Sequence, residues 1–242
     1  MKVLCIGNSF SQDATRYLYD IAKADGVTLE VANLYIGGCP LDRHYRNMLS
    51  GAKAYELQYD GHRTGFFVSL DDALLNRSWD VVTLQQVSSR SFDKASYSPY
   101  IQALAEHVRA CQPTAKLLIH QTWAYEAASD KLLLTAGYET PDEMLADIRI
   151  AYSEAAAEIR ADGIIPSGEL MGKLLEHGIP KVHRDTYHAG LGLGRYALGL
   201  LWYRMLTGAS VMDNTFCSFD QPVTEEEQQI AKACADAFAP LV

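Results

Sequence analysis

Short apolar runs alternate with amphipathic helical patterns along most of this chain of 242 residues. The apolar runs occupy residues 2–6, 28–36, 79–84, 116–120 and 163–166. The first of them is rich in β-branched residues, which is typical of a strand buried on both faces of a parallel sheet. Strands that alternate with helices build a parallel sheet through right-handed crossovers. The sequence therefore predicts a three-layer α/β/α, flavodoxin-like fold, with a parallel sheet of about five strands and helices on both faces.

Cap signals mark the expected starts of several helices. Residues 140–143 read Thr-Pro-Asp-Glu, a capping box with proline at the first helical position. Thr224 begins a second capping box. Ser98, followed by proline, predicts the start of a helix that runs to about Cys111.

One segment departs from the alternation of strands and helices. Residues 55–59 and 66–68 flank an Asp-Gly pair at residues 60–61. This pattern is typical of a β-hairpin, which we expect as an insertion around residues 54–69, outside the main sheet. No linker, internal repeat or low-complexity tract divides the sequence, so residues 1–242 are predicted to form a single domain.

Charge and hydropathy narrow the range of partners. The formal net charge is −9, and no basic cluster rises above scattered lysines and arginines, which argues against a nucleic-acid partner. The same charge makes neutral substrates more natural than strongly anionic ones. No apolar run approaches the roughly 20 residues of a membrane span, so no membrane partner is expected.

The cysteines and the N-terminus point to a cytoplasmic location. The five cysteines are odd in number and widely spaced, with no C-x-x-C pair or Cys/His cluster, so no metal site is expected. The first strand begins at Lys2 without a separate apolar signal region. The alternative that an export signal has been lost, and that the protein works in an oxidising compartment, stays open.

Ser9 occupies the junction between the first strand and a helical pattern. Gly7 and Asn8 break the strand, and apolar residues at helical spacing follow. Backbone N–H groups at a helix N-terminus, together with the helix dipole, favour developing negative charge, so a serine nucleophile would be useful there. Ser9 and Gln12 also fit a capping box, and the two roles stay open at this point.

A second candidate motif lies near the C-terminus. Asp185 and His188 are three residues apart, close enough for the carboxylate to orient one ring nitrogen and leave the other to accept a proton from a hydroxyl group. The alternative is a solvated loop. Among the other histidines, His183 is the only rival base.

These residues resemble the SGNH (GDSL-like) hydrolases. G-N-S-F-S after the first strand resembles block I of that superfamily, D-x-x-H resembles block V, and residues 36–39 resemble block II. The resemblance spans nearly the whole chain, with the blocks in the right order. I-G-N-S-F-S and L-Q-Q-x-S are most similar to a bacterial branch known mainly as a domain of unknown function.

The resemblance implies a role for each matching position. Ser9 would be the nucleophile, His188 the general base and Asp185 its orienting carboxylate, while the backbone N–H groups of Ser9 and Gly38 would bind the oxyanion. No metal or organic cofactor is implied.

Block III departs from the family pattern. The family usually has G-x-N-D after the third strand, and its Asn side chain donates to the oxyanion. Here the region reads Leu-Gln-Gln-Val-Ser-Ser from residue 84. We favour Gln86 over Gln85 as the replacement donor, although strand parity stays open. Trp123 and Tyr125, after the fourth strand, are candidates to line an acyl or sugar pocket or to pack in the core.

Two functions remain. The first is a serine esterase that cleaves a small-molecule or carbohydrate ester, with an acetyl group on a carbohydrate as one candidate. The second is a non-catalytic carbohydrate- or ligand-binding module that retains the fold. The sequence does not indicate the acyl group, the alcohol or the oligomeric state.

Overall fold

A seven-stranded sheet forms the centre of the computed structural model, which describes residues 1–241. Its strand order is β4-β3-β2-β1-β5-β6-β7. The strands are β1 (Lys2–Gly7), β2 (Glu30–Tyr35), β3 (Tyr55–Tyr59), β4 (His62–Val68), β5 (Val81–Leu84), β6 (Lys116–His120) and β7 (Gly163–Ile165). Five of them, from β2 to β7 in that order, run parallel. These are the five predicted parallel strands, and the predicted fold class is confirmed.

The predicted placement of the hairpin outside the main sheet is wrong. Strand β3 pairs antiparallel with β2, and β4 pairs antiparallel with β3, so the hairpin extends the sheet at one edge. Asn33 of β2 donates to Gln58 of β3 over 2.8 Å, and both side chains are buried. The hairpin therefore covers the edge of β2, which would otherwise present unpaired backbone groups to water.

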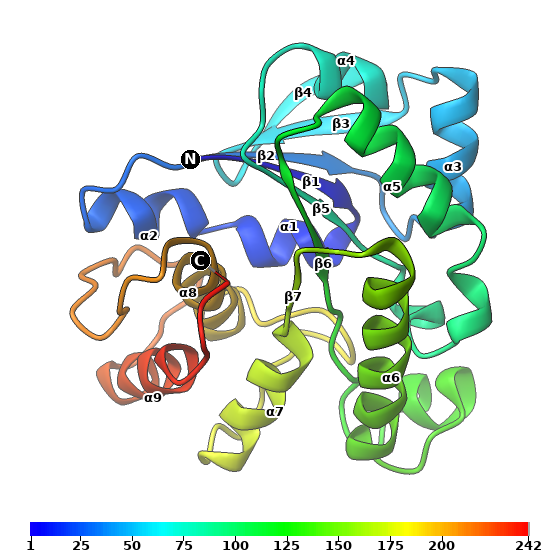
Figure 1. Cartoon of the computed structure of the whole chain (residues 1–242). Coiled ribbons are helices and arrows are strands. Elements are labelled where there is room, and N and C mark those ends of the chain that lie inside the picture. The colour runs from blue at the N-terminus through cyan, green and yellow to red at the C-terminus, as the bar shows by residue number, and fades with distance from the viewer. Residues whose placement is uncertain (242) are drawn as a thin grey trace.

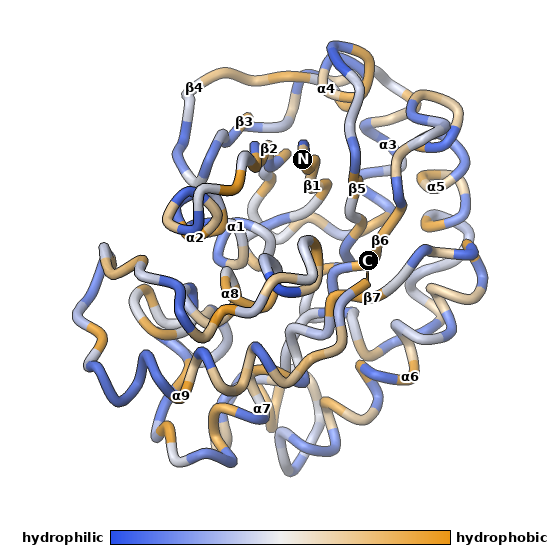
Figure 2. Tube along the Cα trace, turned by 60° about the vertical axis from the view of Figure 1, so that its left-hand side comes forward, coloured by the Kyte–Doolittle hydropathy of each residue, from blue (hydrophilic) through white to orange (hydrophobic). Residues whose placement is uncertain are grey.

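Helices cover both faces of this sheet (Figure 1). One face carries α1 (Ser9–Thr15), α2 (Leu18–Ala24), α7 (Ser167–Glu176), α8 (Leu193–Thr207) and α9 (Glu225–Asp236). The other carries α3 (Leu41–Ser50), α4 (Leu70–Leu75), α5 (Tyr100–Cys111) and α6 (Pro141–Ile159). Figure 2 shows hydrophilic and hydrophobic segments alternating along outer helices such as α6 and α9, as expected of helices with one face in the core.

Most of the predicted helix starts agree with those in the structure. Thr140 and Thr224 each accept a hydrogen bond from the backbone three residues later, and both predicted capping boxes are confirmed. The helix predicted to begin at Ser98 begins instead at Tyr100. The residue before this helix is Pro99, which offers no side-chain cap, and the Ser98 hydroxyl donates instead to Glu158 at 2.6 Å.

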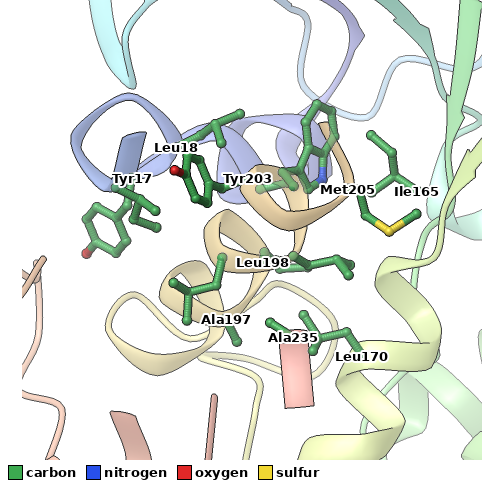
Figure 3. Close-up of a cluster of buried hydrophobic side chains, with 14 of the residues drawn as sticks. Tyr17, Leu18, Ile165, Leu170, Ala197, Leu198, Tyr203, Met205 and Ala235 are labelled. Atoms are coloured by element: carbon green, nitrogen blue, oxygen red, sulfur yellow. The ribbon is translucent and has the colours of Figure 1, made fainter. Parts of the chain in front are cut away.

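Helix α8 is the most deeply buried helix of its layer. Tyr196 to Met205 of α8 include large side chains that are almost wholly inaccessible, such as Trp202 and Tyr203. Figure 3 shows side chains of α8 lying among those of α2, α7, α9 and β7. A helix that is apolar on nearly all sides is fixed in the core. The loop that precedes α8 therefore ends at a fixed position. Within residues 1–241, no helix has both the length and the apolar character needed to cross a membrane.

Candidate active site

The site begins where β1 ends and α1 starts. Asn8 is the N-cap of α1, and its Oδ1 atom accepts a hydrogen bond from the backbone of Phe10 at 3.0 Å. Ser9 is the first residue of the helix. The capping-box interpretation of Ser9 is therefore wrong, because the neighbouring asparagine performs that role and leaves the serine hydroxyl free.

Ser9, His188 and Asp185 form a chain of hydrogen bonds. The Ser9 Oγ atom lies 2.8 Å from Nε2 of His188, and Nδ1 of the same ring lies 2.8 Å from Oδ2 of Asp185. An imidazole that donates from Nδ1 to a carboxylate can accept the serine proton at Nε2. The structure thus brings together the three residues that the two sequence motifs suggested, from positions 179 residues apart.

The Asp185 carboxylate is fixed by its own loop. Oδ1 accepts hydrogen bonds from the backbone N–H groups of Tyr187, at 2.9 Å, and His188, at 2.7 Å. Burial acts to raise the pKa of Asp185, but these backbone hydrogen bonds and the His188 ring outweigh it and lower that pKa to about 2. The carboxylate is consequently ionised at neutral pH and can stabilise an imidazolium at His188.

An ion cluster braces the same loop against α1. Both oxygens of the buried Asp13 carboxylate accept from Arg184, at 2.9 and 2.8 Å, and Oδ1 also accepts from Arg195 at 2.9 Å. Arg184 also donates from its side chain to the carbonyl of Ala189 at 2.6 Å. Asp13 lies on the helix that begins with Ser9, so this cluster links the element of the nucleophile to the loop of the base.

The backbone N–H groups of Ser9 and Gly38 are the candidate donors to an oxyanion. Gly38 adopts a φ of +59°, which favours glycine, in a turn that Asn8 holds by donating to the carbonyl of Cys39 at 3.2 Å. Within residues 1–241, no acceptor engages the backbone N–H of Ser9 or of Gly38. Free N–H groups beside a nucleophile are suited to bind an oxyanion.

A pocket of about 330 Å³ opens over Ser9. Its walls combine the nucleophile, the base and the Gly38 turn with aromatic and hydroxyl side chains. The lining residues are Asn8, Ser9, Phe10, Tyr35, Gly37, Gly38, Val87, Ser88, Ser89, Lys131, Tyr187 and His188. The volume is at the lower end of the range of ligand pockets, which favours a small ligand group.

Neither glutamine at the end of β5 reaches this pocket, which corrects the expectation for Gln86. Its amide donates to the carbonyl and hydroxyl of Ser96, both at 3.0 Å, and its Oε1 accepts from the backbone of Leu41 at 3.0 Å. Gln85 points the other way, with Nε2 2.8 Å from a ring nitrogen of His120. The two side chains point in opposite directions, as predicted, but both amides form hydrogen bonds in the core and not at the pocket.

Ser88 and Ser89 follow β5 and line the pocket instead, and of the two serines the buried one is Ser88. Its hydroxyl oxygen accepts a hydrogen bond from the Tyr125 hydroxyl at 3.1 Å. The sequence offered a signal, a serine-rich loop at residues 88–91, but gave no reason to choose this serine over the glutamines.

Trp123 and Tyr125 lie behind the pocket rather than on its surface. Both side chains are fully buried. The Trp123 ring stacks on Phe10, with centroids 4.1 Å apart, and its Nε1 donates to the carbonyl of Tyr187 at 2.8 Å. They support the residues that line the pocket. The rival base His183 contacts the carbonyl of Ala124 through Nε2 at 3.0 Å and makes no hydrogen bond with Ser9 in the described part of the chain.

One cluster of side chains that could ligate a metal lies outside the pocket. Asp71, His107 and Cys111 place one ligand atom each within 4.8 Å of one another. His107 Nε2 is 2.6 Å from an Asp71 oxygen and 3.9 Å from the Cys111 sulfur. The expectation of no Cys/His cluster is therefore wrong: His107 and Cys111 lie one turn apart on α5, and only Asp71 joins them from a distant part of the chain.

Comparison with known proteins identifies relatives in sequence and in fold. The sequence profile of DUF4886, a domain of unknown function, matches residues 2–238. The crystal structure of a DUF4886 family protein from Bacteroides uniformis has a TM-score of 0.91 and 31% sequence identity, and the match covers 98% of this chain and 93% of that one. No curated protein matches the sequence.

More distant structures show the fold. A candidate SGNH hydrolase from Slackia heliotrinireducens has a TM-score of 0.60 and 22% identity, with 84% of this chain and 97% of that chain covered. A candidate GDSL-like lipase from Parabacteroides merdae has a TM-score of 0.54 and 12% identity, with 83% and 93% covered. The chain thus has an SGNH-like hydrolase fold.

Proposed function

The chain belongs to the DUF4886 family, and from the geometry around Ser9 we propose that it is a serine ester hydrolase. The observation that carries the proposal is the hydrogen-bonded chain from Ser9 through His188 to Asp185, with both distances 2.8 Å, at the wall of a pocket. Nucleophile, base and orienting carboxylate at such distances are the arrangement that activates a serine.

The reaction follows from these positions. His188 Nε2 accepts the Ser9 proton while Oγ attacks the ester carbonyl carbon, and Asp185 stabilises the imidazolium that forms. The tetrahedral intermediate collapses when His188 returns the proton to the leaving alcohol. Water, activated by the same imidazole, then hydrolyses the acyl-enzyme and releases the acid.

Three donors are available to the oxyanion. The backbone N–H groups of Ser9 and Gly38 are two of them. The Ser88 hydroxyl is the third, because its oxygen accepts from Tyr125 and its own proton has no acceptor within residues 1–241. The pocket volume of about 330 Å³ supports a short acyl group, and an acetyl ester of a carbohydrate is one substrate of this size.

A fluorophosphonate probe tests the proposal, because it reacts only with an activated serine. We expect labelling of the wild type and its loss in Ser9→Ala, with a fall in kcat for p-nitrophenyl acetate on the order of 10⁴-fold or more.

Ser167 provides the matched control for this experiment. It is also the first residue of a helix after a parallel strand, and its hydroxyl lies 3.0 Å from a ring nitrogen of His120, but it is fully buried and outside the pocket. Ser167→Ala should keep the label. An unlabelled wild type, or a Ser9→Ala protein that retains most of the activity, would contradict the proposal and favour a binding module.

A further inference from the structure

Lys131 is the lysine that lines the pocket over Ser9. It begins the short helical turn η3 (Lys131–Ala136) and is half-buried. Its ammonium nitrogen lies 4.3 Å from the ring centroid of Tyr187 and 5.7 Å from that of Tyr125. A cation above an aromatic face is held by the ring quadrupole, so these rings fix the ammonium at the pocket wall.

The Lys131 ammonium has no charged partner in the part of the chain that the structure describes. In the described residues 1–241, no carboxylate lies within salt-bridge distance of Lys131, and its ammonium group donates no hydrogen bond. Other half-buried or exposed cations near the site, such as Arg16, Arg184 and Arg195, are neutralised by Asp13 or Asp220. The positive charge of Lys131 therefore remains available to a ligand.

The charge of Lys131 lies close to the reacting groups. Tyr187, over which the ammonium lies, directly precedes His188, and the two rings are 3.9 Å apart between centroids. Lys131 and the catalytic imidazole thus both lie against the Tyr187 ring, and both line the same pocket as Ser9. A small ester bound at Ser9 could place a charged substituent beside this ammonium.

We propose that Lys131 binds a singly charged anionic group, a carboxylate being the simplest, on the substrate of the hydrolase. The inference rests on the proposed function, which supplies the ester. One unneutralised ammonium matches one negative charge. The net charge of −9 disfavours anions at long range, but at physiological salt that field is screened beyond about 8 Å, whereas a contact inside a pocket is screened much less. This refines the expectation that neutral substrates are more natural.

Matched substrates test the proposal with the whole protein. 3-Acetoxybenzoate and 3-acetoxybenzamide carry the same acetyl ester and differ by one charge on the alcohol side, and the meta position prevents the carboxylate from attacking its own ester. Phenyl hydrogen adipate and phenyl hexanoate place the same contrast on the acyl side. For each pair, the ratio of kcat/KM between the anionic and neutral member is compared between wild type and variants.

We expect Lys131→Met to lower this ratio roughly tenfold for at least one pair, the size of effect that loss of one partly buried charge contact produces. Lys131→Arg should restore much of it. The control is Lys23→Met, which removes an exposed lysine that also lies over a tyrosine ring, at 5.8 Å from the centroid of Tyr19, but outside the pocket. It should leave both ratios unchanged.

Unchanged ratios in Lys131→Met for both pairs would overturn the inference and leave ester hydrolysis standing. Absence of hydrolysis and of fluorophosphonate labelling in the wild type would instead overturn the proposed function. In that case, calorimetric binding of 3-hydroxybenzoate against 3-hydroxybenzamide decides the role of Lys131. Tighter binding of the anion that disappears in Lys131→Met supports it, and equal binding overturns it.

Discussion

Asn8 and Ser9 divide two tasks between adjacent residues. The Asn8 side chain caps α1 through Oδ1 and holds the Gly38 turn by donating from Nδ2 to the Cys39 carbonyl. The serine hydroxyl therefore faces His188 with no competing partner on the helix. Because the neighbouring Asn8 pairs a free backbone N–H group at the start of the helix, Ser9 can occupy the helix start and act as a nucleophile.

Ser88 is expected to act on the transition state. If its hydroxyl donates to the oxyanion, Ser88→Ala should lower kcat by roughly 10- to 100-fold with little change in KM, since the interaction forms only as negative charge develops. Tyr125→Phe, which removes the hydrogen bond that orients this hydroxyl, should cause a smaller loss in kcat. Steady-state kinetics on one ester measures both.

Gln86→Ala is the contrasting variant for that experiment. Its side chain accepts from the backbone of Leu41 and donates to Ser96, so its removal leaves buried backbone groups unpaired and should lower the free energy of unfolding by about 1–3 kcal/mol. If kcat falls in Gln86→Ala while Ser88→Ala retains it, the assignment of the third donor is contradicted.

The two glutamines show what sequence reasoning can and cannot reach at this scale. Alternation along an extended segment correctly separates Gln85 from Gln86, which point to opposite layers. The partners of each amide, His120 and Leu41, come from distant parts of the chain. Only tertiary structure shows that both amides are already engaged, and that a serine two residues later reaches the pocket.

At the scale of elements, α1 and the loop before α8 are joined by the Asp13 cluster. The Asp13 carboxylate is wholly buried between Arg184 and Arg195. Arg184 lies next to Asp185, and its backbone N–H also donates to the carbonyl of His188 at 3.0 Å. The distance between the nucleophile and its base is therefore set by an ion cluster as well as by the loop.

Asp13→Asn should destabilise the fold and loosen the site. Removal of one charge leaves two guanidinium groups without their buried partner, which typically costs about 3–5 kcal/mol in the free energy of unfolding. We also expect a lower kcat, because the His188 loop loses its brace. Urea unfolding and ester kinetics measure the two effects.

Asp220→Asn is the control in the same cluster. Asp220 accepts from Arg16 and Arg195, but its side chain is 29% exposed, so water can replace the lost partner. Its substitution should cost about 1 kcal/mol or less. Equal losses in the two variants would contradict a special role for the buried carboxylate.

The misplaced hairpin is a failure at the element level that has a related cause. The hairpin was recognised from its Asp-Gly turn, but its membership of the sheet depends on contacts with β2, such as the Asn33–Gln58 hydrogen bond. Local patterns identify strands, whereas the pairing of strands is decided by distant partners.

At the scale of the whole molecule, each layer beside the sheet buries a neutral histidine. His44, in the layer of α3, stacks on Tyr55, and His120 packs edge-on to Trp202 of α8. Both side chains are fully buried, and burial lowers the pKa of each imidazole from 6.5 to about 3. Folding therefore holds both rings in the neutral form.

This burial should make the fold less stable as the pH falls from about 6.5 towards 3. In that window the unfolded chain protonates both histidines and the folded chain does not, so protons favour unfolding. At about pH 4.5 each ring contributes a loss of about 2–3 kcal/mol relative to pH 7, while most carboxylates are still ionised. Urea unfolding at the two pH values measures the loss.

His44→Gln should remove about half of this loss. His177→Gln replaces an exposed histidine at the C-terminal end of α7 and should leave the loss unchanged. A free energy of unfolding that stays constant between these pH values would contradict the neutral assignment of both buried rings.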